Sequence, residues 1–128
     1  MVDHIRVMLE IGPKGKKVVA VAPDWPGLAR GAATGEAAIE RLLSYLPRYT
    51  PVTHLAGMAT ALANATVVDV VEQYPGTGST DFWGISFAFS SIDQETMSGE
   101  ALDRELTLMR ACWAFFDDVR ARVSPELQ

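Results

Sequence analysis

The chain has 128 residues, of which 48% are hydrophobic and 21% charged, and its formal net charge at pH 7 is −5. This composition is that of a folded globular protein and excludes a disordered chain. No apolar run approaches the roughly 18 residues that a membrane span needs. The negative charge argues against the sequence-independent attraction to phosphate that drives most nucleic-acid binding.

A hairpin is predicted at the start of the chain. Apolar residues recur at every second position over residues 5–11, which is the period of a half-buried strand. A second strand is predicted over 17–23. Residues 12–16 between them, Gly-Pro-Lys-Gly-Lys, are typical turn formers, so the two strands are expected to pair antiparallel.

A turn and then a helix follow the hairpin. The sequence Pro-Asp-Trp-Pro-Gly at 23–27 is expected to stop the strand ladder, because proline has no amide hydrogen to donate. Thr34 is a suitable helix cap, and the apolar spacing after it predicts a helix over 34–46. Prolines at 47 and 51 mark its end, and a weaker, alanine-rich helix is predicted over 52–63.

A second hairpin is predicted further along the chain. Residues 66–74 form a β-branched run, and 82–89 alternate large aromatic or aliphatic side chains with small ones. These two runs are expected to pair as antiparallel strands. The sequence from Tyr74 to Asp81, Tyr-Pro-Gly-Thr-Gly-Ser-Thr-Asp, joins them and is interpreted as a long hairpin loop.

The longest predicted helix spans 98–123, with Ser98 as its cap. Its apolar residues recur at three- and four-residue steps, with Val119 adjoining them. The stripe consists of Leu102, Leu106, Met109, Trp113, Phe116 and Val123. The opposite side is interpreted as solvated because it carries Asp103, Arg104, Arg110, Asp117, Asp118 and Arg122.

These elements predict an α+β fold. We expect an antiparallel sheet of two β-hairpins packed against two to three helices, with one face covered by the helices at 34–46 and 98–123. A chain of this length is large enough for one core, so residues 1–128 are interpreted as a single domain. Its two parts would be a β-β-α unit at 5–49 and, at 64–123, the second hairpin with the long terminal helix.

The loop between the strands of the second hairpin offers a candidate ligand site. Aromatic walls with a few polar groups are the usual lining of small-molecule pockets. The residues that could line such a pocket are Tyr74, Ser79, Thr80, Asp81 and Trp83. Beside aromatic rings Asp81 could have a raised pKa and serve as an acid or base, which keeps a small-molecule-binding protein or enzyme as the alternative function.

The sequence predicts neither a metal site nor a cofactor. Its single cysteine, Cys112, and two scattered histidines, His4 and His54, lack the ligand spacing of zinc or iron sites. No catalytic triad or Cys-His pair can be assembled from them. Cys112 lies in an apolar helix and is interpreted as a buried small hydrophobe. One cysteine excludes an internal disulfide and suits the cytoplasm.

The apolar content predicts an interface and a homodimer, because exposed apolar patches usually mark contact surfaces. The candidate interface residues are Trp25, Trp83, Phe87, Trp113 and Phe116. For Trp25 two interpretations stand side by side: an exposed anchor for a partner, or a lid on the first helix.

The stretch from 18 to 49 resembles a known family. A strand, the turn Pro23-Asp24-Trp25-Pro26-Gly27, a glycine at 31 and a Thr-Gly-Glu-Ala-Ala helix start at 34 resemble HicB-like domains, and the resemblance covers about 5–49. It implies a β-β-β-α-β fold or a shorter relative of the double-stranded-RNA-binding fold. It also implies dimerisation and an antitoxin-like protein whose partner is a small, toxin-like ribonuclease. Pro23, Asp24, Pro26, Gly27 and Gly31 would form turns, and Glu36 and Ala37 the helix start.

The rest of the chain departs from that pattern, because antitoxin members often end in a DNA-binding motif and this chain ends in an amphipathic helix. The whole chain is also similar to a group of actinobacterial proteins of unestablished function. In some of these a DinB-like helical region follows, whose metal-binding histidine pattern is not present here. The sequence thus favours a non-catalytic, HicB-like protein-interaction module of a bacterial cytoplasm.

Overall fold

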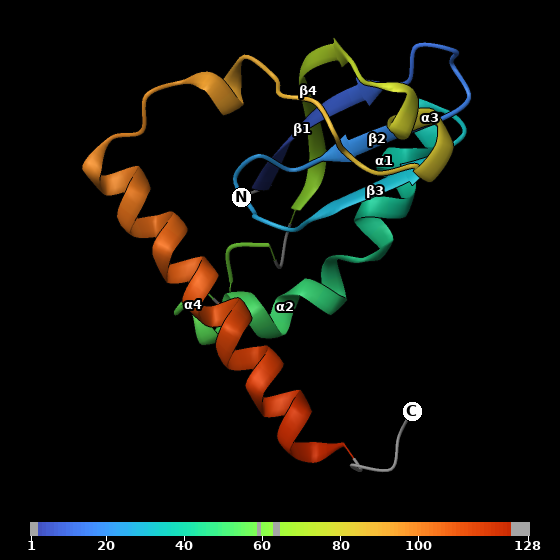
Figure 1. Ribbon diagram of the computed structural model, residues 1–128. Coiled ribbons are helices and arrows are strands. Elements are labelled where there is room, and N and C mark those ends of the chain that lie inside the picture. Colours follow the sequence, from blue (N-terminus) through green and yellow to red (C-terminus); the bar gives the residue numbers. More distant parts are fainter. Residues whose placement is uncertain (1–2, 59, 63–64, 124–128) are drawn as a thin grey trace.

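The computed structural model describes residues 3–58, 60–62 and 65–123. Its elements in chain order are β1 (Asp3–Ile11), β2 (Val18–Val21), β3 (Ala29–Ala32), α1 (Gly35–Ser44), α2 (Leu46–Leu55), β4 (Ala65–Pro75), α3 (Gly78–Trp83), the short 3-10 helix η1 (Ile92–Gln94) and α4 (Gly99–Arg122). The four strands form one mixed sheet, and the helices lie around it (Figure 1). The predicted α+β class is confirmed.

The strands follow the spatial order β3-β2-β1-β4. β1, β2 and β3 are antiparallel neighbours, with Met8 opposite Val21 in the first pair and Val21 opposite Ala29 in the second. β4 lies parallel to β1, with Val7 opposite Val70, because the chain crosses back through α1 and α2 before it enters β4. The predicted first hairpin is confirmed, and both parts of the chain contribute to the same sheet.

The strand β3 has no counterpart among the strands predicted from the residue pattern, which ended the ladder at the turn 23–27. Backbone hydrogen bonds close this turn: the amide of Ala22 donates to the carbonyl of Leu28 at 2.9 Å, and the amide of Leu28 donates to the carbonyl of Trp25 at 3.0 Å. The chain therefore reverses and pairs again. The Ala-Arg-Gly-Ala sequence of β3 lacks the apolar alternation that would have predicted a strand.

The predicted hairpin of 66–74 with 82–89 is wrong, because only the first run is a strand. The hydroxyl of Thr77 caps α3, and Thr80 completes a capping box. Gly84, in the left-handed conformation with φ 68°, ends this helix. Local helix signals therefore override the strand-like alternation at Phe82 and Trp83, and residues 84–89 follow as irregular backbone.

Helix α1 begins as predicted. The hydroxyl of Thr34 accepts a hydrogen bond from the amide of Ala37 at 3.1 Å, and Glu36 lies in the first turn, where negative charge is favourable. The helix ends at Ser44, two residues before its predicted end.

Helix α2 begins six residues before the weaker helix predicted over 52–63. Pro47 lies in its first turn, where a missing amide hydrogen costs no helical hydrogen bond. Proline therefore begins this helix instead of ending the one before it. The helix ends at Leu55, and residues 59 and 63 of the predicted segment lie outside the described residues.

The two faces of the sheet carry different covers. On one face, Ile5, Val7 and Leu9 of β1 join Ala38 and Leu42 of α1 in the apolar core. The opposite face is crossed by the segment that follows β4, which we call the cover segment (residues 76–97, including α3 and η1) (Figure 1). The sheet is therefore buried on both sides near its centre.

Gly31 allows the cover segment to approach the sheet. A Cβ atom at Gly31 would lie 2.2 Å from the carbonyl oxygen of Gly84, so any other residue would collide with the backbone at the end of α3. The glycine in β3 thus fixes where the cover segment lies.

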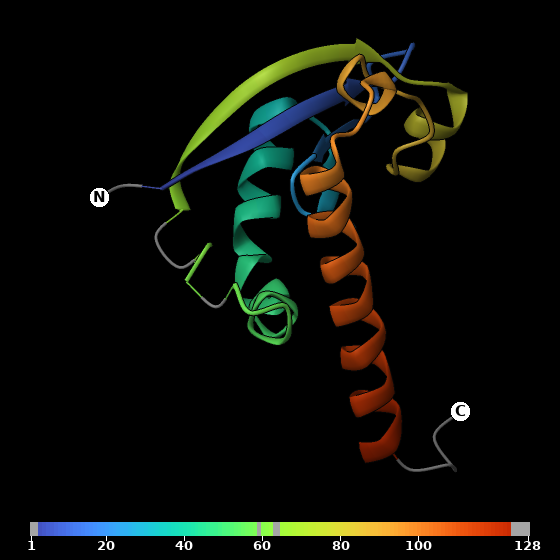
Figure 2. The same ribbon diagram turned by 90° about the vertical axis from the view of Figure 1, so that its left-hand side faces the viewer.

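Helix α4 has its predicted bounds, from the Ser98 cap to Val123, but its orientation differs from the prediction. It packs against α2 and leaves the sheet to the cover segment. Its C-terminal half projects beyond α2 (Figure 2). The residues that it buries are Leu108 and Ala111, which do not belong to the predicted apolar stripe.

Candidate functional site

The carboxylate of Glu10 holds the cover segment on the sheet. Glu10 is 0% exposed and accepts four hydrogen bonds, from the hydroxyls of Thr80 and Ser86 and from the backbone amides of Phe87 and Ala88, at 2.7 to 3.2 Å. Burial raises the pKa of Glu10, but these bonds outweigh it and hold the pKa below its usual value. Glu10 is therefore an ionised, structural carboxylate.

Asp81, the predicted acid or base, holds the turn of the first hairpin. Its carboxylate accepts hydrogen bonds from the backbone amides of Lys14, Lys16 and Lys17 at 2.7, 2.8 and 3.1 Å. Burial raises its pKa, but the bonds from these amides dominate and lower it overall. The expected raised pKa is wrong. A Cβ atom on Gly12 would lie 1.9 Å from Oδ1 of Asp81, so this contact also requires a glycine in the turn.

The other predicted ligand residues lie in different environments. Tyr74 and Thr80 are buried, Ser79 is half-buried and Trp83 is exposed. Among the described residues the buried hydroxyl of Tyr74 has no hydrogen-bond partner. Burial and then the nearby Glu10 carboxylate raise the pKa of Tyr74, so it stays protonated at neutral pH.

These residues do not converge on a shared cavity. The nearest hollow, of about 310 Å³, is lined by Pro13, Lys14, Lys16, Gly78, Asp81 and Phe82. Asp81 is the one predicted ligand residue in it, and its carboxylate already accepts three backbone hydrogen bonds. The geometry therefore gives the small-molecule alternative no set of free polar groups.

The structure decides between the two interpretations of Trp25. The ring is 7% exposed and lies in the same core cluster as Leu28 and Leu42. It meets the ring of Tyr49 edge to face, with the centroids 6.2 Å apart, and the hydroxyl of Tyr49 donates to the carbonyl of Pro26 at 2.7 Å. Trp25 is thus a core residue, and its assignment to an interface is wrong.

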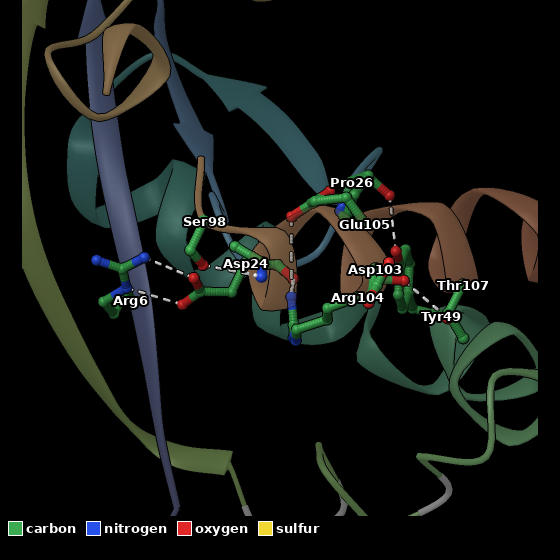
Figure 3. A network of polar contacts seen from close by, with 10 residues as sticks. Arg6, Asp24, Pro26, Tyr49, Ser98, Asp103, Arg104, Glu105 and Thr107 are labelled. Atoms are coloured by element: carbon green, nitrogen blue, oxygen red, sulfur yellow. Dashed lines mark hydrogen bonds and ion pairs between the residues drawn. The ribbon is translucent and has the colours of Figure 1, made fainter. Parts of the chain in front are cut away.

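Arg104 attaches α4 to the Trp25 turn (Figure 3). Its guanidinium lies 4.5 Å above the Trp25 ring, a cation–π contact, and donates a hydrogen bond to the carbonyl of Asp24. The carboxylate of Asp24 in turn accepts two bonds from the Arg6 guanidinium, at 2.8 and 2.5 Å. The Arg6 contact is the main cause that lowers the pKa of Asp24, so this connection from β1 to α4 is charged at neutral pH.

Helix α4 carries apolar residues on two sides. One side faces the core through Leu108, Ala111, Cys112 and Phe115. The other is the predicted stripe, which we call the α4 seam: Leu102, Leu106, Met109, Trp113, Phe116 and Val123. At about 100° per residue these two sides lie roughly 120° apart around the helix. The prediction that the helix at 98–123 covers the sheet is wrong, because α4 packs against α2.

The α4 seam is exposed where its residues are largest. Trp113 is 62% and Phe116 66% exposed, and both are predicted interface residues. An apolar stripe of this length on the free side of a helix is unusual for a chain that acts alone. The seam is the clearest candidate interaction surface of the described residues.

A second exposed apolar group lies on the cover segment. Its members are Phe82, Trp83, Ile85, Phe87 and Phe89, and it includes the predicted interface residues Trp83 and Phe87. The rings of Phe82 and Trp83 meet edge to face at 4.7 Å. These side chains are available to a partner because Glu10 binds the backbone and hydroxyls of the segment and leaves its large side chains outside.

The remaining titratable candidates show no shared chemistry. Cys112 is a free, half-buried thiol whose pKa is raised by burial, and Nδ1 of His4 lies 2.9 Å from the carboxylate of Asp69. Within the described part of the chain, no three His, Cys, Asp or Glu side chains gather as metal ligands. The helices in that part include none long and apolar enough to cross a membrane.

Comparison of the chain with protein-family models, with curated proteins and with solved structures finds no match.

The residues that position the site were the hardest to find from the sequence. Glu10 occupies the polar side of an alternating strand, a position that normally faces solvent, and Arg104 was assigned to a solvated helix face. Both side chains are organised by segments far away along the chain. The seam residues, in contrast, were found from their spacing, although the direction in which they face was not.

Proposed function

We propose that this chain is a non-catalytic protein-interaction module of the HicB-like type. The observation that carries the proposal is the exposed α4 seam, with Trp113 and Phe116 about two-thirds exposed on a helix whose other side is anchored to the core. Rigidly held aromatic side chains are efficient anchors for a partner, since they bury a large area at a small entropic cost.

The order of the elements supports the HicB-like part of the proposal. The chain begins with three antiparallel strands, β1, β2 and β3, which are followed by α1. The next strand, β4, comes after the additional helix α2. Apart from α2, this is the β-β-β-α-β order that the resemblance implies. The turn residues Pro23, Asp24, Pro26 and Gly27 connect two of these strands. A toxin-like ribonuclease is then one class of partner, and a second copy of the chain another.

The proposal includes a bacterial cytoplasm as the location. Cys112 is a free thiol in this structure, and a reducing compartment keeps such thiols reduced. The module would act there by presenting surfaces, because its buried carboxylates, Glu10 and Asp81, already accept hydrogen bonds from the fold.

Site-specific photo-crosslinking in cells of the native host tests this function. A photoreactive residue replaces Phe116 in the seam or, as the matched control, Asp118, which is also exposed but lies off the seam. We expect a discrete crosslinked species from position 116 and none from 118. The same yield at both positions, or no product at 116, would contradict an interaction role for the seam.

A further inference from the structure

The seam has the spacing of a coiled coil. Leu102, Met109, Phe116 and Val123 follow one another at seven-residue intervals, and Leu106 and Trp113 come four residues after the first two. This is the a/d pattern of a heptad repeat, in which Arg120 occupies the last a position. The helix spans 24 residues, so the repeat extends over about three heptads of this chain.

Resting on the proposed function, we infer that the partner of the seam is a second copy of this chain, whose α4 pairs antiparallel with the first. In this arrangement each helix supplies the cover that the other lacks. The two cores lie on the outer sides of the helix pair, because the core-facing residues Leu108 and Ala111 are on a different side of α4 from the seam.

Charge complementarity selects the register. The positions that flank the seam on its free side carry Asp103, Arg110 and Asp117. An antiparallel pair that sets Trp113 against the partner's Phe116 brings Arg110 beside the partner's Asp117, and the two-fold axis repeats this contact. A shift by one heptad would set Arg110 against itself, and like charges at such positions disfavour pairing. The preferred pair is thus centred near residue 114.

The apolar pairs of this register are also complementary. Leu106 meets the partner's Val123, and Met109 meets the aliphatic stem of the partner's Arg120, whose charged end reaches solvent.

The exposed area is sufficient for a small dimer interface. With Trp113 62% and Phe116 66% exposed, these two rings supply roughly 200–300 Å² per copy, since a large aromatic side chain buries about 150–250 Å². A standard interface buries about 800 Å² per partner. The two rings thus provide roughly a third of it, and the remaining seam and flanking side chains can supply the rest.

The first measurement is the subunit count, by sedimentation equilibrium over a range of concentrations and by native mass spectrometry. We expect a dimer that Trp113→Glu converts to a folded monomer, with folding checked by circular dichroism. A wild-type monomer at every concentration overturns the self-pairing. In that case a crosslink from position 116 to another protein would still support the proposed function, so the two failures are distinguishable.

Cysteine crosslinking then tests the orientation in a Cys112→Ser background. An antiparallel pair joins Leu106→Cys chains to Val123→Cys chains when the two are mixed, and neither variant crosslinks to itself. A parallel pair gives the reverse result, since each variant then meets its own position, and that result overturns the inference.

Charge reversal tests the register. Arg110→Asp and Asp117→Arg are each expected to weaken the dimer roughly tenfold or more by placing like charges together, and the double variant is expected to restore it. The control Asp103→Arg makes the same change of charge at an equivalent helical position outside the overlap and leaves the dimer intact. Equal weakening by this control, or no recovery in the double variant, overturns the register.

Discussion

The two faces of the sheet are covered by different kinds of structure. Under α1 the contact is apolar and periodic, with Leu42 and Ala38 both 0% exposed. On the other face the cover segment has little regular structure, and Glu10 and Asp81 attach it through hydrogen bonds to backbone and hydroxyl groups. Apolar packing is spread over many contacts, whereas the polar attachment is concentrated in two carboxylates.

The difference predicts two kinds of response to mutation. Loss of an apolar contact under α1 should lower the stability of the whole fold, because the core is shared by many elements. Loss of a carboxylate on the other face should release mainly the segment that it binds, because proteins open in local units when few apolar contacts hold them.

The largest effect is expected for Leu42→Ala. The cavity that this substitution leaves in the core should cost about 2–5 kcal/mol of unfolding free energy, measured as a lower denaturant midpoint. Hydrogen exchange should accelerate in β1, β2 and α1 together. Leu55→Ala is the control, because Leu55 is half exposed, and an equal loss in both variants would contradict a core centred on Leu42.

The next effect is expected for Glu10→Gln. The amide nitrogen replaces one of the two acceptor oxygens, so the backbone amide of Phe87 or Ala88 loses its hydrogen-bond partner, which should cost about 2–4 kcal/mol. The amides of Phe87 and Ala88 should exchange faster than those of β2. Glu40→Gln, an exposed neutral replacement on α1, serves as the control. Uniform acceleration over the whole sheet would show that the cover segment is not a separate unit.

The wild type and Glu10→Gln should also differ in how their unfolding free energy depends on pH, and the pKa of Glu10 sets the sign of that difference. Its folded pKa lies below the ordinary 4.5, so its stabilising effect is complete at neutral pH and is lost as pH falls below 4.5 through the folded pKa. The unfolding free energy of the wild type should therefore decrease more steeply on acidification than that of Glu10→Gln. Parallel curves for the two proteins would contradict an ionised Glu10.

The same contrast explains how much of the fold was predictable from the sequence. The caps at Thr34 and Ser98 and the alternation of β1 are local signals, and they gave the bounds of α1, β1 and α4 closely. The register of β4 depends on a crossover through α1 and α2, so a run of valines could not reveal that its partner is the parallel strand β1.

The candidate site was predictable in part for the same reason. The spacing of the α4 seam is a local property of a single helix, and Trp113 and Phe116 were identified from it. Whether that stripe faces the core is decided elsewhere, by the contacts of Leu108 and Phe115 and by the Trp25 turn that binds Arg104. The polar loop was misinterpreted because Asp81 finds its three donors in a turn more than sixty residues earlier in the chain.

The smallest effect is expected for Asp81→Asn, which sharpens the comparison between the two carboxylates. Asp81 binds three amides of one hairpin turn, whereas Glu10 binds a segment that crosses the sheet, so the shift of the denaturant midpoint should be smaller than for Glu10→Gln. Faster exchange should be confined to the amides of Lys14, Lys16 and Lys17. Asp103→Asn, on the exposed side of α4, is the control.

A larger midpoint shift for Asp81→Asn than for Glu10→Gln would reverse the order of the two attachments. It would mean that the contacts between Asp81 of α3 and the hairpin turn fix the position of the cover segment. The hydrogen bonds of Glu10 would then form only as a consequence of that position. The expected order instead places the decisive contact at Glu10, because it is the more deeply buried carboxylate and its partners lie on both sides of the close approach between Gly84 and Gly31.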